Sequence, residues 1–233
     1  MSLVNVESLA ATVDAVNEAF FVGKPPSRAA RAEAAKWIAG RQGLAGSYAG
    51  MFAPTAKDFA EGVRLFTGER FATRAGAAHV LGEEASRALL LLDAPLAGVR
   101  DALARATDGM LLRLRAAEQR ERNMGRPWLG QYCCGKCTAA LWRHLAVGGL
   151  ERAERHLAAG MRALELHRDG SGKWRRYPFH YTLLALSEID ARGAVTEMRY
   201  AAPILERLLK RPQRDDRFER RRRVVAERVL ARC

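Results

Sequence analysis

The chain has 233 residues, of which 48% are hydrophobic, so it can bury a sizeable core as one large domain or two small ones. Its formal net charge of +13 raises the question of an anionic partner, such as nucleic acid, a membrane surface or a phosphorylated ligand. Few of the 39 basic residues are lysines, and a composition rich in alanine and arginine can also reflect genome composition and not function.

The amino-terminal segment lacks a basic leader and carries acidic residues, so it is predicted to be an amphipathic helix and not a signal peptide. No apolar run approaches membrane-spanning length. We therefore expect a cytoplasmic protein without a transmembrane segment. Its four cysteines are then expected to be thiols, metal ligands or redox groups and not structural disulfides.

Apolar residues recur every three or four positions almost throughout, which is typical of helices and not of strands. We predict an all-α protein of about ten helices, and the absence of a visible boundary favours a single domain over residues 1–233. The predicted helices cover residues 4–22, 27–39, 55–66, 71–92, 95–121, 133–147, 150–167, 178–190, 196–210 and 215–231.

Three glycine-rich elbows with aromatic residues separate some of these helices, at residues 41–54, 123–132 and 167–177. Pro178 follows the last elbow, and proline is favoured in the first turn of a helix. Tyr132 and Tyr177 each precede an apolar helix and stand 45 positions apart, the length of a two-helix repeat. The pattern predicts helical hairpin repeats.

The elbows and the run WRRYPFHYTLLALSEI at residues 174–189 resemble the repeats of the α/α-toroid superfamily of protein prenyltransferases and terpene cyclases. The resemblance implies a partial α/α toroid or superhelical bundle in which residues 133–147 and 179–190 form neighbouring inner helices. It also implies a catalytic zinc ion held by Cys137 and His180, with Gly135 where the family has an aspartate. The chain is about two hairpins short of a six-hairpin ring, so a partner or a second copy would close the open edge.

Cys133, Cys134 and Cys137 fall in the first two turns of a predicted helix, where the helix dipole lowers the pKa of a thiol. The C-x-x-C spacing of Cys134 and Cys137 could hold a metal ion or form a redox pair, and free buried thiols are the alternative. One such pair supplies two ligands, whereas a closed zinc site needs four. His180 is the first candidate for a further ligand, although a histidine beside an apolar run is more often a core residue. The other candidates are His144, His167 and Cys233.

Basic and aromatic side chains gather in the elbows, where arginine forks could bind a phosphate or diphosphate group. The alternative is a solvated elbow with its tryptophan packed against a neighbouring helix. The candidate ligand-binding residues are Trp174, Arg175, Arg176, Tyr181 and Arg126.

The run Arg220 to Arg223 invites a nucleic-acid interpretation, but Asp216 and Glu219 stand four residues before two of these arginines. Because Val225 and Val229 also give this segment an apolar side, it is predicted to be a packed terminal helix with a charged outer face.

The sequence therefore predicts a pocket lined by cysteine and histidine with a basic rim, binding an isoprenoid-diphosphate-like or other anionic ligand with zinc as candidate cofactor. In this hypothesis Cys137 and His180 are the catalytic residues, and Cys134, Cys137 and His180 are the metal ligands. The alternative hypothesis is a non-enzymatic basic helical-repeat module that binds another protein or nucleic acid through its surface.

Overall fold

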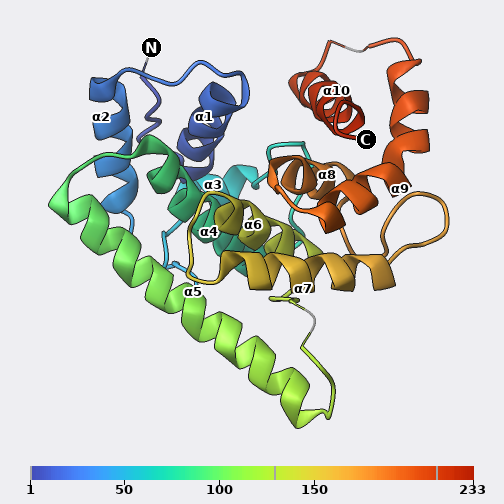
Figure 1. Cartoon of the computed structure of the whole chain (residues 1–233). Helices are drawn as coiled ribbons and strands as arrows, with labels where there is room; N and C mark the ends of the chain where they lie inside the picture. The colour runs from blue at the N-terminus through green and yellow to red at the C-terminus, as the bar shows by residue number, and fades with distance from the viewer. Residues whose placement is uncertain (1, 129, 214) are drawn as a thin grey trace. The chain divides into compact units, whose positions relative to one another are not determined.

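The computed structural model describes residues 2–128, 130–213 and 215–233, and the described residues form ten α-helices and no strand (Figure 1). The all-α prediction is confirmed. The helices are α1 (Leu9–Phe21), α2 (Arg28–Ala39), α3 (Ala56–Glu61), α4 (Arg74–Leu92), α5 (Ala97–Asn123), α6 (Gly135–Ala146), α7 (Ala153–Leu166), α8 (Phe179–Glu188), α9 (Arg192–Leu209) and α10 (Arg217–Leu230).

The chain divides into two compact units. The N-terminal unit comprises Met1–Arg64 and Arg70–Ala116, and the C-terminal unit comprises Leu65–Glu69 and Ala117–Cys233. The long helix α5 continues from the first unit into the second. Nothing in the sequence marks these points, and a single domain stays a prediction.

In the N-terminal unit, α4 is buried along most of its length and packs against α1 and α2. Its polar side chains are paired inside the unit: Asn17 donates to Glu84 Oε2 at 2.8 Å and accepts from Arg87 at 2.6 Å. The Asp58 carboxylate accepts hydrogen bonds from the Ser8 hydroxyl and from the backbone N–H of Leu9, so it caps α1.

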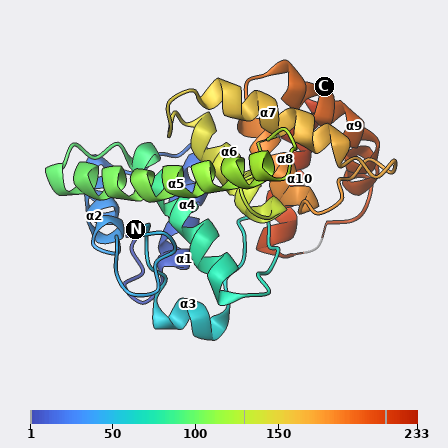
Figure 2. The ribbon, with the colours of Figure 1, turned by 90° about the horizontal axis from the view of Figure 1, so that it is seen from below.

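In the C-terminal unit, α6 packs against α7 and α8, and α9 packs against α7, α8 and α10. The orange and red helices α9 and α10 lie side by side in Figure 1, and α7 lies beside α9 in Figure 2. Trp142 and Tyr181 are among the largest fully buried side chains of this unit. Their burial anchors α6 and α8, the two helices whose first turns carry the candidate site.

Several helix boundaries differ from the prediction: α3 ends at Glu61 and not at residue 66, because Gly62 adopts a positive φ of 77° and ends the helix, and α4 and α7 each begin three residues late. Two further differences also have physical reasons. α1 begins at Leu9 and not near Val4, because the Ser8 hydroxyl accepts from the Ala11 N–H and sets the N-cap there. α9 begins at Arg192 and not at residue 196, and it continues through Gly193. A Cβ atom at position 193 would lie 2.9 Å from Met161 Cβ, so the glycine permits a close approach of α9 to α7.

None of the described helices is both long and apolar enough to cross a membrane.

Candidate functional site

The candidate site starts where α6 begins, at a close contact with the elbow before α8. A Cβ atom at Gly135 would lie 2.1 Å from the backbone carbonyl oxygen of Arg176. Only glycine fits there, so the position at which the resemblance leads one to expect an aspartate cannot hold a side chain in this fold. The two helices that the resemblance sets side by side, α6 and α8, pack against each other, and this contact fixes their starts together.

Three cysteine side chains gather at the start of α6. Cys134 is the N-cap residue and Cys137 lies in the first turn, and their Sγ atoms are 3.2 Å apart. The Sγ atom of Cys133 lies within 4.8 Å of that of Cys137, close enough for both to hold one metal ion. Cys133 and Cys134 are exposed and Cys137 is buried, and none of the three forms a disulfide with another described cysteine. The predicted C-x-x-C pair is thus joined by a third sulfur.

The environment of Cys134 favours the thiolate. Hydrogen bonds from the Cys133 thiol, then from the Cys137 thiol, lower the pKa of Cys134 to about 2, and the backbone N–H groups of Cys137 and Lys136 add to this effect. The first turn of a helix offers such N–H groups together with the positive end of the dipole. A thiolate is the form in which cysteine binds a metal or attacks a disulfide.

His180 lies in the first turn of α8 and faces α9. It lines a cavity of about 400 Å³ together with residues of the preceding loop and of the end of α9. Within the described residues, His180 does not join Cys134 and Cys137 in a group of ligand atoms within 4.8 Å of one another. The structure therefore brings the two predicted sulfur ligands together but places the predicted imidazole ligand on a separate cavity.

The His180 ring is neutral at physiological pH. Burial lowers its pKa to about 4, and the positive charges of Arg222 and Lys173 act in the same direction. The ring packs edge-on against Phe179, with centroids 5.1 Å apart. Its Nδ1 atom is buried and has no hydrogen-bond partner among the described residues.

The predicted ligand-binding aromatics are packed into the C-terminal unit. Trp174 is 4% exposed, and its indole N–H donates to the Glu197 carboxylate at 2.7 Å. Arg168 donates to the same carboxylate at 2.7 Å. Tyr181 is fully buried, and its backbone N–H donates to Glu69 Oε1 at 3.1 Å. These contacts match the alternative in which the elbow tryptophan packs against a neighbouring helix.

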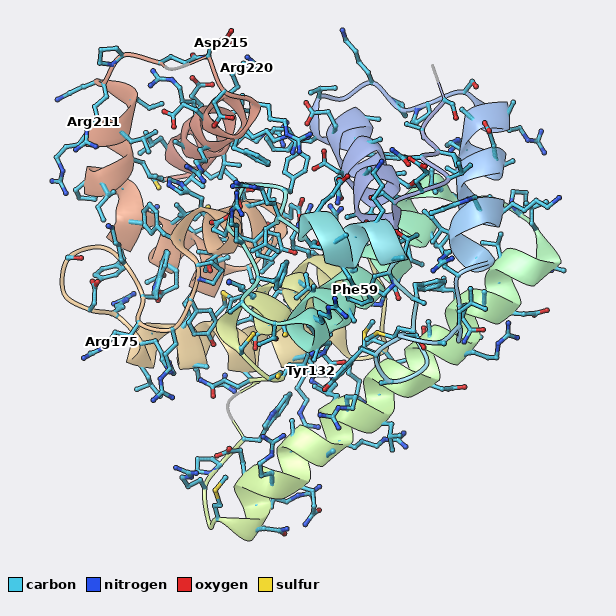
Figure 3. The ribbon with its side chains drawn as sticks, turned by 180° about the vertical axis from the view of Figure 1, so that it is seen from behind. Phe59, Tyr132, Arg175, Arg211, Asp215 and Arg220 are labelled. Atoms are coloured by element: carbon cyan, nitrogen blue, oxygen red, sulfur yellow. The ribbon has the colours of Figure 1, made fainter. Side chains whose placement is uncertain are left out.

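Among the described residues that line the His180 cavity, none is one of the three predicted rim arginines. Arg175 is labelled in the loop before α8 in Figure 3, and its guanidinium donates to the backbone carbonyl of Arg168. Arg176 is exposed and has a left-handed backbone (φ 68°), which directs its carbonyl toward Gly135. Arg126 is exposed and pairs with Glu121 at 3.4 Å. Arg176 thus acts through its backbone at the start of α6.

The arginine run of α10, residues 220–223, makes contacts that stabilise the C-terminal unit. Arg221 and Arg222 donate to the backbone carbonyls of Phe66 and Thr67, which ties the short segment Leu65–Glu69 to α10. Arg223 donates to three carbonyls at the end of α9, those of Leu208, Leu209 and Arg211, where helical carbonyls lack intrahelical partners. Arg220 pairs with Asp215 at 2.6 Å, and both are labelled at the start of α10 in Figure 3.

Lys173 belongs to the basic elbow that the sequence singled out, but the two other basic side chains that line the His180 cavity, Arg207 and Arg211, were not predicted. Arg207 and Arg211 stand four residues apart, a spacing that places both on one face of α9 and its continuation. Such a pair is common on solvated helices, so spacing alone gives no reason to select it. What distinguishes the pair is His180, which lies more than 25 positions earlier in the sequence.

No family model, curated protein or solved structure matches this chain.

Proposed function

We propose that the C-terminal unit binds zinc through the thiolates of Cys133, Cys134 and Cys137. The observation that supports this proposal is the gathering of three sulfurs at the first turn of α6. Three sulfur donors suit a thiophilic ion, and three protein ligands leave the fourth position of a tetrahedral ion for a ligand from solvent.

The spacing of the sulfurs supports the same proposal. Two thiolates that each lie about 2.3 Å from one tetrahedral zinc ion are about 3.8 Å from each other. The Sγ atoms of Cys134 and Cys137 are 3.2 Å apart, about 0.6 Å closer than this value, and those of Cys133 and Cys137 lie within 4.8 Å of each other. Small rotations of the exposed side chains would therefore create the site without moving α6.

The prenyltransferase-like version of this function, in which Cys137 and His180 share the ion and act on an isoprenoid diphosphate, stays a prediction from the resemblance. The alternative of a basic module that binds protein or nucleic acid also stays a prediction. The arginine run of α10 does not argue for it, because Arg221, Arg222 and Arg223 are engaged with backbone carbonyls. Cytoplasmic location and assembly of several copies likewise stay predictions.

Cobalt substitution tests the proposal, because each cysteine thiolate bound to Co²⁺ adds intensity to the sulfur-to-metal charge-transfer band. We expect the band of the wild-type protein to correspond to three thiolates, and that of Cys134→Ser to two. Cys233→Ser is the matched control, since Cys233 is also an exposed free thiol but lies at the end of the chain and donates to the Val229 carbonyl. An absent band, or an equal loss in both variants, would refute the proposal. A wild-type protein in which Cys134 and Cys137 are linked by a disulfide would do the same.

A further inference from the structure

The cavity beside His180 combines positive charge with an apolar wall. Its basic side chains are Lys173, from the loop before α8, and Arg207 and Arg211, from the end of α9. None of the described residues that line this cavity is acidic. Within the described residues, none of the three cations forms an ion pair with a carboxylate, whereas Arg168 and Arg220 each do. Three cations in such a position repel one another unless an anion lies between them.

The interior of the cavity is suited to the rest of a small molecule. Phe179, Ile204 and Leu208 supply apolar surface, and the imidazole ring of His180 also lines the cavity. The volume of about 400 Å³ lies within the range of sites that hold small organic ligands, and it far exceeds the space that a single inorganic ion needs.

A second cavity, of about 570 Å³, shares His180, Leu208 and Arg211 with the first and continues past Pro212 and Gln213. One carboxylate, that of Glu219, lies on this extension. The charge is therefore concentrated on the side of Lys173, Arg207 and Arg211. Figure 3 shows Arg211 at the end of α9, in the segment that leads to α10.

The start of α8 adds to the positive potential. Pro178 caps this helix without a side-chain hydrogen bond, so the first turn that carries Phe179 and His180 receives no side-chain oxygen from its cap. The Glu69 carboxylate already accepts from the Tyr181 N–H in this turn, which shows that the turn accommodates an anionic oxygen. Arg222 contributes further positive charge at His180.

We propose that this cavity binds a small organic molecule that carries a phosphate group on an apolar body, with Arg207, Arg211 and Lys173 on the phosphate. A phosphate dianion can accept hydrogen bonds from several cations at once, and arginine forks match its oxygens, whereas a carboxylate carries a single charge. The apolar body lies against Phe179, Ile204 and Leu208, and the imidazole of His180 offers a hydrogen bond to a polar group of the ligand. This site is separate from the proposed zinc site.

Calorimetric titration with phenyl phosphate tests the site, with benzoate and inorganic phosphate as comparison ligands. We expect phenyl phosphate to bind more tightly than either, since only it satisfies both the cations and the apolar wall. Arg211→Gln and Arg207→Gln should each weaken phenyl phosphate binding by roughly tenfold, the usual loss for one hydrogen bond between charged groups. Arg192→Gln is the matched control, because Arg192 is an exposed arginine of the same helix that does not line the cavity.

Equal binding of phenyl phosphate by Arg211→Gln, Arg207→Gln and the wild type would overturn the proposal, as would an equal loss in Arg192→Gln, which would indicate attraction to the overall charge. If either variant fails to fold, Lys173→Gln replaces it with the same expected loss. A triple variant in which Cys133, Cys134 and Cys137 are serine should bind phenyl phosphate as the wild type does. Failure of the zinc proposal therefore leaves this test unaffected.

Discussion

The buried carboxylate of Glu197 is expected to be one of the most sensitive positions of the C-terminal unit. Glu197 is 2% exposed, and it accepts from the Trp174 indole N–H and from both Nε and Nη2 of Arg168. It thereby joins α9 to the elbow before α8. Glu197→Ala removes every one of these acceptors at once.

The cost can be estimated from the burial of the two donors. The indole N–H of Trp174, a residue that is 4% exposed, would lose its acceptor, which costs about 1 to 3 kcal/mol. The Arg168 side chain is 28% exposed, so water replaces part of its lost pairing. The added cost therefore stays near about 1 kcal/mol, the value for an accessible ion pair, and below the roughly 3 to 5 kcal/mol lost when a fully buried pair is broken. We predict a loss of about 3 kcal/mol in the free energy of unfolding for Glu197→Ala, and a smaller loss for Glu197→Gln, whose carbonyl can still accept from one donor.

Urea denaturation followed by tryptophan fluorescence measures this loss, because three of the four tryptophans, Trp128, Trp142 and Trp174, belong to the C-terminal unit. Glu165→Gln is the matched control, since Glu165 also faces Arg168, at 3.9 Å, but is 62% exposed. We expect a change below about 0.5 kcal/mol for this control. If Glu197→Ala costs no more than Glu165→Gln, the inferred role of the buried carboxylate is wrong.

Three further predictions concern the first turns of α6 and α8. The pKa of His180 is about 4 in the folded protein and 6.5 in the unfolded chain, so the ring takes up a proton more readily when the chain unfolds, and about 3 kcal/mol of the free energy of unfolding should be lost as the pH falls from 6.5 to 4. Urea titrations at several pH values should show a flatter pH dependence for His180→Gln than for the wild type. An unchanged slope would contradict the assignment. Gly135→Ala should cost about 1 to 3 kcal/mol and weaken cobalt binding, because the added Cβ collides with the Arg176 carbonyl, whereas Gly98→Ala, with open space around it, should not destabilise the protein. Alkylation of Cys134 by iodoacetamide, followed by mass spectrometry, should proceed at a nearly constant rate between pH 5 and 8, because the pKa of this thiol is lowered to about 2. Alkylation of Cys233, whose pKa is raised by burial, should slow about tenfold for each unit by which the pH falls. Parallel rate profiles for the two residues would show that Cys134 is not a thiolate in this pH range.

The helices could be predicted from local chemistry. Apolar periodicity predicted how many helices there are, and capping residues such as Ser27, whose hydroxyl accepts from the Ala30 N–H, fix where individual helices start. Gly193 shows where local reasoning fails, because the same residue that breaks an isolated helix is required where α9 approaches Met161 on α7. The division of the chain into two units could not be predicted from the sequence, because α5 continues from one unit into the other as an uninterrupted helix and no linker-like segment marks the boundary.

The candidate site was predictable in part. The sequence places Cys133, Cys134 and Cys137 within a few residues of one another, so their clustering follows from helix geometry once α6 begins at Gly135. The direction of His180 does not follow from its sequence position, because it depends on how α8 is rotated against α6 and α9. The cavity of Lys173, Arg207 and Arg211 joins segments that are distant in the chain, and only tertiary packing brings their charges together.

Metal analysis of the purified protein is the most direct test of the proposed cysteine centre. After incubation with a small excess of zinc and removal of unbound metal, we predict close to one zinc ion per wild-type or Cys233→Ser chain and far less for the variant in which Cys133, Cys134 and Cys137 are serine. Wild-type protein that retains no zinc, or a triple variant that retains as much as the wild type, would contradict the assignment of these three sulfurs as a metal site.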